Sequence, residues 1–269
     1  MHPIAFQFGQ LTITWYGIMI AVAFLAGLWT ASRRGLLDSV AAEKILDLGP
    51  WLIVGGVVGA RVHYVLTFWR EQFAGQPLEA FAVWRGGLVF YGGLIGASLA
   101  CGLYARLKKI PLWKLADILA PSIALGHVFG RLGCLLNGCC YGRECHLPWA
   151  ITFPQTSSVE SGRAPPGIPL HPTQIYESGL NLIFYVGLAW LYRHKKFEGQ
   201  VFANYLVGYA ILRSVVETFR GDYSPDQRCL GGQVTPAQVV SAFILVVGLL
   251  LLFLLPRFRE KKATVAHEV

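Results

Sequence analysis

Polar residues recur at helical spacing within one apolar segment near the carboxyl end. Their positions at i, i+4, i+8 and i+11 would form one stripe on an α-helix: Tyr209, Arg213, Glu217 and Arg220. An ionised side chain in hydrocarbon costs at least about 2.5 to 3.5 kcal/mol, so the stripe should face partners, trapped water or a ligand. Arg213 and Glu217 could simply pair and hold helices together. Because one carboxylate cannot neutralise two arginines, the stripe favours a functional site.

A further arginine lies in the segment Gly130-Arg131-Leu132-Gly133, and its helical face would also carry His127 and Cys134. A guanidinium binds phosphate through paired N–H donors, and a phospholipid headgroup is the abundant phosphate at a membrane surface. We therefore expect a lipid substrate. The alternative is a long arginine side chain that extends to the interface without binding a ligand.

The segment from His171 to Glu177 has Pro172 where a first helical turn tolerates proline, and Gln174 begins a polar face. His171 is a candidate general base, because the ordinary pKa of histidine is near 6.5. A histidine at this place can equally be a hydrogen-bonding group at a helix start.

Composition indicates an integral membrane protein. The chain has 269 residues, of which 54% are hydrophobic and 14% charged, which is too apolar for a soluble domain. Its net charge of +8 comes from short basic clusters beside apolar segments, and no aromatic and basic groove motif is present, so we expect no nucleic-acid partner. The segment before Leu11 lacks a basic region and a cleavage site, so we expect no removable signal peptide.

The hydropathy pattern predicts an all-α bundle of about seven transmembrane helices that forms a single catalytic domain over 1–269. The predicted spans are about 13–32, 45–68, 87–106, 114–136, 172–192, 200–220 and 237–256. Basic clusters follow the first, third, fifth and seventh spans, so the positive-inside rule places the amino terminus outside and the carboxyl terminus in the cytoplasm.

With this orientation, the unusual polar residues of several spans lie at one depth, in the outer leaflet. They are Tyr16, Tyr91, Arg131, Asn137, His171, Gln174, Tyr176, Glu177, Glu217 and Arg220. Random scatter would place some of them in the inner half of the membrane. We therefore interpret these residues as one site.

The connections and the glycines also carry predictions. The proline-rich segment 137–171 should form a small irregular cap on the outer face, with a short strand between Trp149 and Phe153. Small residues let membrane helices approach closely. Three groups of them predict close contacts of the second, third and fourth spans: Gly55, Gly56 and Gly59; Gly92, Gly93 and Gly96; and Gly126, Gly130 and Gly133.

Four of the six cysteines cluster at Cys134, Cys139, Cys140 and Cys145. Their spacing matches no paired zinc signature, so we expect no metal and no other cofactor. An outward location favours a disulfide, and the sequence leaves its pairing open among Cys139, Cys140, Cys145 and Cys229.

Several motifs in order resemble the bacterial prolipoprotein diacylglyceryl transferases over nearly the whole chain. They are Trp15-Tyr16-Gly17, the glycine pairs 86–87 and 92–93, segment 130–138 (GRLGCLLNG), segment 171–177 (HPTQIYE), Gly208-Tyr209 through Arg213, Glu217 and Arg220, and Gly232-Gln233. An ordered set of this kind is far more specific than any single motif.

The resemblance implies an enzyme of the bacterial inner membrane that moves the diacylglyceryl group of phosphatidylglycerol to the lipobox cysteine of a prolipoprotein signal peptide. A thioether forms and glycerol phosphate leaves at the periplasmic leaflet. The family roles correspond here to Arg131 and Arg213 as catalytic and lipid-binding residues. The supporting residues are Tyr16, Asn137, Tyr209, Glu217 and Arg220.

Two departures from the family pattern concern the chemistry. Many members have histidine where this chain has Tyr91, and tyrosine, with an ordinary pKa near 10, is a poor base at neutral pH. We therefore expect Tyr91 to orient substrate and assign deprotonation to His171, Glu177 or water. Cys134 and Cys139 replace asparagine and glutamate of other members.

Two hypotheses from other classes compete with the transferase. A phospholipid or anionic-solute carrier would use the same arginines without chemistry, but the chain shows neither the repeats nor the midplane site typical of transporters. A membrane thiol oxidoreductase would lose function when Cys139 and Cys140 are replaced by serine. The transferase hypothesis predicts milder effects of these replacements.

Overall fold

The computed structural model describes residues 3–9, 11–154, 163–222 and 234–267. Helices account for most of this part of the chain, and each predicted span overlaps a helix of 18 residues or more. Their bounds are α1 (Trp15–Leu37), α3 (Leu48–Thr67), α4 (Phe90–Leu107), α5 (Leu112–Asn137), α6 (Thr173–Arg193), α7 (Gln200–Glu217) and α8 (Pro236–His267). The all-α prediction is therefore confirmed.

Four helical segments of the described chain are long and apolar enough to cross a membrane. They are Trp15–Leu37, Ala42–Thr67, Leu112–Asn137 and Pro236–Arg257. The second of these joins the short helix α2 (Ala42–Leu46) to α3. Length and composition therefore establish an α-helical membrane protein, since about 20 apolar residues span a bilayer core.

A β-hairpin precedes α1, in a segment for which the sequence analysis made no structural prediction. Strand β1 (Ile4–Phe8) pairs antiparallel with β2 (Leu11–Thr14), and Gly9 in the connecting turn has a φ of 60°, which glycine adopts without strain. The Thr14 hydroxyl accepts a hydrogen bond from the backbone N–H of Gly17 at 3.2 Å. This bond satisfies one of the unpaired donors at the start of α1.

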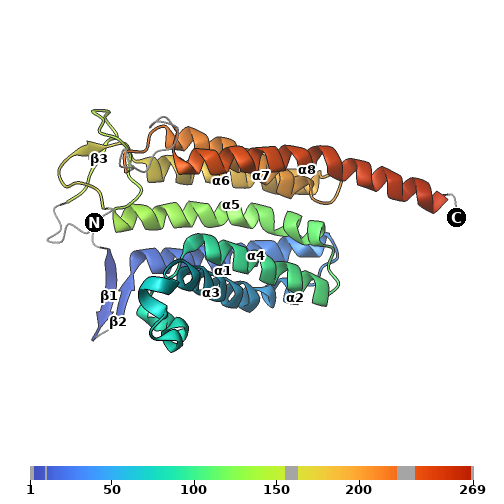
Figure 1. Cartoon of the computed structure of the whole chain (residues 1–269). Coiled ribbons are helices and arrows are strands. Elements are labelled where there is room, and N and C mark those ends of the chain that lie inside the picture. The colour runs from blue at the N-terminus through green and yellow to red at the C-terminus, as the bar shows by residue number, and fades with distance from the viewer. Residues whose placement is uncertain (1–2, 10, 155–162, 223–233, 268–269) are drawn as a thin grey trace. The chain divides into compact units, whose positions relative to one another are not determined.

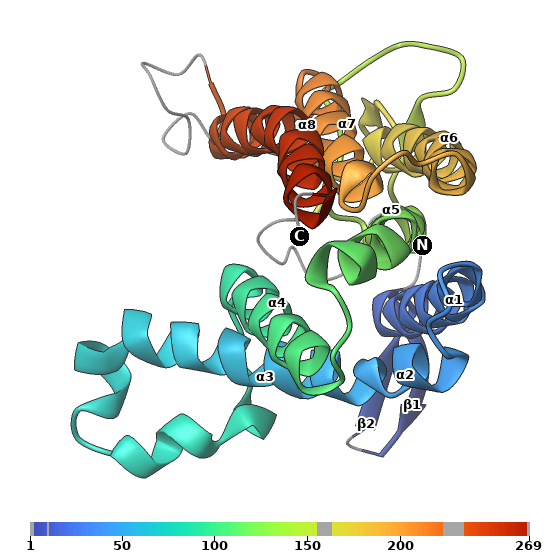
Figure 2. The ribbon, with the colours of Figure 1, turned by 90° about the vertical axis from the view of Figure 1, so that its right-hand side faces the viewer.

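The chain divides into two compact units. The first unit contains residues up to Thr30 and from Ala116 onward, and the second contains Ala31–Leu115. In the first unit α6 packs against α7, and α7 packs against α8, as Figures 1 and 2 show.

A buried carboxylate that the sequence analysis overlooked fixes the start of α7 in the first unit. The two oxygens of Asp117 on α5 accept backbone N–H groups of Gly199 (2.9 Å) and Phe202 (3.0 Å), and Lys195 lies 3.5 Å away. Unpaired N–H groups and the positive end of the helix dipole stabilise an anion there. Asp117 therefore ties α5 to the α7 terminus.

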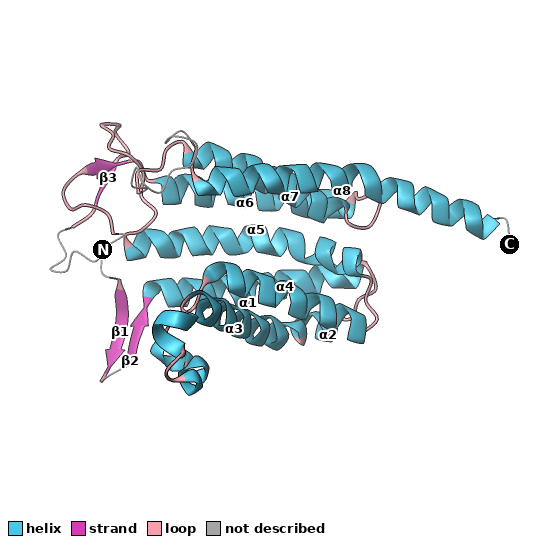
Figure 3. Cartoon of the chain, in the orientation of Figure 1, coloured by secondary structure: helices cyan, strands magenta, loops and turns pink. Residues whose placement is uncertain are grey.

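The connection between α5 and α6 forms the predicted irregular cap, within which helices are absent from the described residues (Figure 3). Strand β3 (Ile151–Thr152) pairs antiparallel with β4 (Pro169–Leu170), so the short strand predicted between Trp149 and Phe153 is confirmed in a shorter form. A bridge between Gly142 and Arg220 links this cap to the end of α7.

Glycines bring α3 and α4 into backbone contact in the second unit. A Cβ atom on Gly55 would lie 2.8 Å from the Gly96 carbonyl oxygen, and a Cβ on Gly59 or Gly96 would clash with the facing backbone. The predicted close approach of these two helices is confirmed. The prediction is wrong for Gly126 on α5, because a Cβ there would meet nothing within 4 Å.

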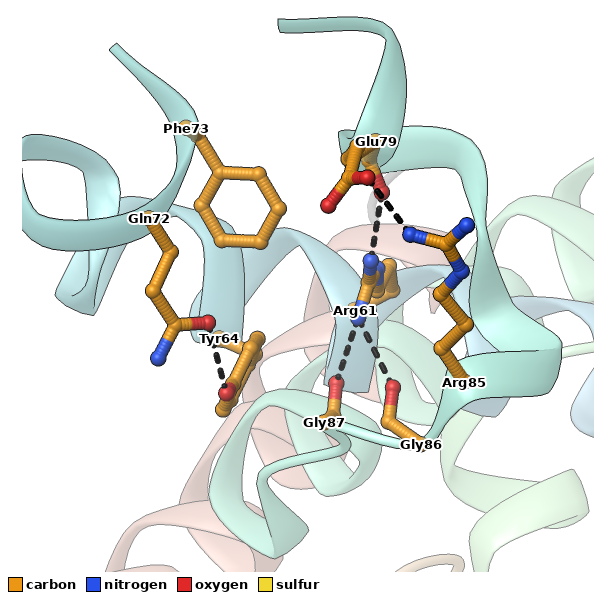
Figure 4. A pocket seen from close by; sticks show the side chains of 8 residues that line it. All are labelled: Arg61, Tyr64, Gln72, Phe73, Glu79, Arg85, Gly86 and Gly87. Atoms are coloured by element: carbon orange, nitrogen blue, oxygen red, sulfur yellow. Dashed lines mark hydrogen bonds and ion pairs between the residues drawn. The ribbon is translucent and has the colours of Figure 1, made fainter. Parts of the chain in front are cut away.

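Arg61 organises the segment that follows α3, which contains the helical turns η1 (Trp69–Phe73), η2 (Pro77–Phe81) and η3 (Val83–Arg85). Its guanidinium donates hydrogen bonds to the carbonyl oxygens of residues 79, 80, 86 and 87 beside a cavity of about 180 Å³ (Figure 4). It also lies 5.5 Å from the ring centre of Tyr64 and 5.4 Å from that of Phe73. All its nitrogens are engaged, so Arg61 is a structural residue.

We expect Gly96→Ala to destabilise the protein by about 1–3 kcal/mol, because the new methyl group would force α3 and α4 apart. Thermal unfolding in detergent measures the effect. Gly102→Ala on the same helix is the matched control, because a Cβ there meets nothing within 4 Å. The control should stay within about 1 kcal/mol of the parent or gain stability. Equal losses in both variants would contradict the close-approach interpretation.

Candidate active site

One carboxylate from α6 lies between two arginines from α5 and α7. Glu177 Oε1 is 3.0 Å from Nε of Arg131, and Glu177 Oε2 is 3.6 Å from Nη1 of Arg213. Glu177 is fully enclosed, with 3% of its side chain exposed. The two guanidinium groups that the sequence analysis singled out therefore meet through a shared carboxylate.

A second carboxylate completes the cluster. Glu217 Oε2 lies 2.7 Å from Nη2 of Arg213, one helical turn away on α7. Two arginines thus face two carboxylates, and the cluster is neutral as a whole. The sequence argument counted Arg213 and Arg220 against Glu217 alone. It missed two carboxylates, because Arg213 also contacts Glu177 on a different helix and Arg220 pairs with Asp222.

Arg131 is the member of the cluster that remains open to a ligand. Its side chain is 17% exposed, against 9% for Arg213, and among the described residues only its Nε contacts an acceptor. The two Nη groups are therefore available to an incoming anion. A guanidinium presents these donors in the fork geometry that suits a phosphate.

Buried acceptors lie on α6 and α7, the two helices that carry Glu177 and Arg213. Glu217 Oε1, Gln174 Oε1 and Asn181 Oδ1 accept no hydrogen bond within the described part of the chain. An unsatisfied buried polar atom costs about 1–3 kcal/mol. These oxygens therefore mark places where water or the hydroxyl groups of a substrate would bind.

Aromatic rings stack along the α7 side of the cluster. The ring centre of Tyr209 lies 5.2 Å from that of His127, nearly parallel to it, and 5.9 Å from that of Tyr205. The Tyr205 hydroxyl is 3.3 Å from Nε2 of His127. The sequence analysis missed Tyr205, although its i, i+4 spacing to Tyr209 extends the same helical face.

Arg220 lies outside the predicted helical stripe. Helix α7 ends at Glu217, and Arg220 instead forms the bridge with Gly142. Its Nε donates to Asp222 Oδ1 at 2.8 Å, and its Nη2 pairs with the other oxygen of that carboxylate. The predicted helix over 200–220 was too long because hydropathy does not register pairing with a distant loop.

His171 belongs to an aromatic cluster in the cap. Its Nδ1 lies 3.2 Å from the Tyr176 hydroxyl, which also accepts a hydrogen bond from Trp149 Nε1 at 2.7 Å. The Phe219 ring centre lies 5.6 Å from that of His171. The imidazole therefore forms a hydrogen bond beside the start of α6.

Three thiols converge where α5 ends. The sulfur atoms of Cys134, Cys139 and Cys140 all lie within 4.8 Å of one another. Hydrogen bonding to the other two thiols lowers the pKa of Cys140, and the guanidinium groups of Arg220 and Arg131 act in the same direction.

The cysteines of the described chain are free thiols, so the predicted disulfide is wrong for Cys139, Cys140 and Cys145. Cys145 is buried apart from the other thiols, with its backbone N–H bonded to Pro169. Cys229 and the motif Gly232-Gln233 lie outside the described residues.

The remaining predicted site residues occupy three places. Asn137, the last residue of α5, donates from Nδ2 to the Cys139 sulfur at 3.6 Å. Tyr16 packs against Gly133, where an added Cβ would lie 3.1 Å from its ring. Tyr91 lies in the second unit, in the first turn of α4, with 54% of its surface exposed.

Fold and site together define a helical membrane protein in which arginines and carboxylates form a buried polar cluster. The chain belongs to the prolipoprotein diacylglyceryl transferase family, whose model matches residues 3–254. This membership confirms the resemblance drawn from the motifs.

Curated relatives carry the name phosphatidylglycerol--prolipoprotein diacylglyceryl transferase. The protein of Synechococcus elongatus is 34% identical over 92% of this chain and 85% of its own length. The protein of Bordetella bronchiseptica is 38% identical over 82% of each chain, and that of Bordetella avium is 37% identical over 95% of each.

We expect Glu177→Gln to destabilise the protein by about 3–5 kcal/mol, because it leaves two buried guanidinium groups without their shared anion. Glu79→Gln is the control, since it removes the carboxylate of an exposed pair with Arg85 and should cost about 0–1 kcal/mol. Both variants are compared by thermal unfolding in the same detergent. A Glu177→Gln protein as stable as the control would show that the shared carboxylate does not hold the cluster.

Proposed function

We propose that this protein transfers the diacylglyceryl group of phosphatidylglycerol to a cysteine thiol of a prolipoprotein. The products are a thioether-linked lipoprotein precursor and glycerol phosphate. The observation that carries the proposal is the convergence of Arg131 and Arg213 on Glu177, with the Nη groups of Arg131 open to a phosphate. Family membership and the relatives' names support the same reaction.

The arginines would act on the leaving group. Arg131 binds the lipid phosphate through its two Nη groups, while Glu177 fixes the orientation of the guanidinium through Nε. Arg213, held by Glu217, adds positive charge from the facing helix. Negative charge grows on the phosphate as it departs, so donors already in position stabilise the transition state more than the bound lipid.

The chemical step is a substitution at carbon. The acceptor thiol loses its proton to water, its sulfur attacks the terminal carbon of the diacylglyceryl group, and the bond from that carbon to the phosphate oxygen breaks. Glycerol phosphate leaves with the electron pair. The ordinary thiol pKa near 8.5 means that activation of the sulfur is part of catalysis.

The buried oxygen atoms near the arginines would recognise the free glycerol of the lipid headgroup. Its hydroxyl groups can donate to Glu217 Oε1 and Gln174 Oε1, which otherwise accept no hydrogen bond within the described residues. A lipid that lacks these hydroxyls would leave the acceptors unpaired, and such mismatches give strong discrimination. This arrangement favours phosphatidylglycerol over other phospholipids.

We extend the proposal to the membrane arrangement. All seven long helices span the bacterial inner membrane as one catalytic domain, the amino terminus is outside, and the site opens to the periplasmic leaflet. The basic clusters beside alternate spans support this orientation. The acceptor is the lipobox cysteine of an exported signal peptide, and Tyr91 orients substrate.

The carrier hypothesis makes a different prediction about the same arginines. A carrier would move labelled phosphatidylglycerol without cleaving it. The transferase releases labelled glycerol phosphate only when a peptide with an acceptor cysteine is present. Release that does not depend on the peptide, or no release from active vesicles, would contradict the transferase.

We expect Arg131→Lys to lower kcat/KM about 10²- to 10³-fold, because lysine keeps the charge but loses the fork of donors at the phosphate. Glycerol phosphate release from phosphatidylglycerol vesicles with a lipobox peptide measures the rate. Arg70→Lys, an exposed arginine after α3, is the control and should retain the parent rate. A parent-like rate for Arg131→Lys would remove Arg131 from the catalytic role.

A further inference from the structure

Three thiols lie next to the proposed phosphate site, in the group Cys134, Cys139 and Cys140. We propose that they bind one Zn²⁺ ion as thiolates and leave its fourth coordination position open to the acceptor cysteine thiol. This inference rests on the proposed transfer reaction, because it assigns the ion to activation of the thiol that is alkylated. It revises two expectations of the sequence analysis, namely a metal-free site and mild effects of replacing Cys139 and Cys140 with serine.

The sulfur positions fit a tetrahedral ion. Zinc binds thiolate at about 2.3 Å, which places two sulfur ligands about 3.8 Å apart. The three sulfur atoms are already within 4.8 Å of one another, so closure needs side-chain movements of about 1 Å. The sequence does not reveal this geometry, because Cys134 lies in the last turn of α5 while Cys139 and Cys140 follow the turn after the helix.

That turn is held from two sides. Gly138 has a φ of 77° and Cys140 a φ of 60°, a conformation that non-glycine residues adopt rarely. Gln174 Nε2 donates to the Cys139 carbonyl and Thr173 Oγ1 to the Cys140 carbonyl, each at 2.8 Å. The first turn of α6 therefore presents both thiols toward Cys134, and such fixed ligands favour metal binding.

The described residues provide three ligands rather than four. Structural zinc sites are closed by four protein ligands, whereas catalytic sites have three and keep one position open. Cys134 is buried, and Cys139 and Cys140 are partly exposed, so the cluster can be reached from one side.

The surrounding charges suit an anionic metal complex. Zinc with three thiolates carries a net charge of −1, and Arg131 and Arg220 interact electrostatically with Cys140. Arg131 also lies three residues before Cys134 on α5, so the two side chains occupy adjacent positions on one helix face. A phosphate on Arg131 and a thiol on zinc would therefore flank the same carbon.

The step balances without an oxidant or reductant. The acceptor thiol coordinates to zinc and releases its proton to water, since a coordinating thiol is deprotonated. The sulfur then attacks the glyceryl carbon while the carbon–oxygen bond to the phosphate breaks, and glycerol phosphate leaves with the electron pair. The thioether product is a weak ligand and dissociates, which reopens the position.

The test begins with metal content. Full-length protein purified in detergent without chelator should contain about one zinc ion per chain. Cys134→Ser, Cys139→Ser and Cys140→Ser should each weaken zinc binding at least about tenfold. Cys101→Ser and Cys145→Ser are matched controls that should retain it. Loss of zinc from Cys229→Ser would show a fourth protein ligand and overturn the open position.

Cobalt reports on the open position directly. Protein loaded with Co²⁺ in place of zinc should show tetrahedral absorption bands that shift when a lipobox peptide is added, and not when its cysteine is replaced by serine. Bands unaffected by the cysteine peptide would overturn the proposal.

Removal of zinc by a chelator should lower glycerol phosphate release about 10²-fold or more, and re-addition of zinc should restore it.

These outcomes separate the two proposals. Two outcomes would overturn the zinc site without contradicting the transferase. One is transfer at the full rate by zinc-free protein. The other is a disulfide among the three thiols, detected as a loss of two mass units in the purified enzyme. Zinc-loaded protein that releases no glycerol phosphate overturns the transferase. Serine variants that lose zinc but still bind phosphatidylglycerol show that the fold survives, so their loss of rate reports on the metal.

Discussion

The shared carboxylate of Glu177 is the interaction on which the site depends. Two guanidinium groups from α5 and α7 would repel each other strongly in a buried place, because electrostatic energies rise as the effective dielectric constant falls. The Glu177 carboxylate contacts both guanidinium groups, so its negative charge offsets their repulsion and attracts α5 and α7 to α6. Breaking such a buried set costs far more than breaking a surface pair, so the helices are held where the site needs them.

The first turn of α6 connects the parts of the site. Glu177 fixes the arginines, while Thr173 and Gln174, one turn earlier, hold the backbone of the Cys139–Cys140 turn. The first turn of α6 therefore positions both the phosphate-binding arginines and the thiol cluster. A rigid helix of this kind places groups more accurately than a loop.

Two buried arginines, Arg61 and Arg131, have different roles in this protein. Arg61 donates from all three of its nitrogens to four backbone carbonyl oxygens and supports the segment after α3. Arg131 uses only Nε among the described residues. Satisfied donors thus identify a structural arginine, and unsatisfied ones identify a binding arginine, a distinction that composition and position do not reveal.

The sequence by itself determined the helices, the membrane class, the glycine contact of α3 with α4, and the family. Hydropathy and small-residue spacing are local patterns that report on one element at a time, and ordered motifs report on ancestry. Only the tertiary structure decided that Glu177 joins Arg131 to Arg213, that Arg220 leaves the helix, that Asp117 binds the start of α7, and that three cysteines meet. Each of these depends on which residue of a distant segment lies opposite, and periodicity along one helix carries no information about its neighbour.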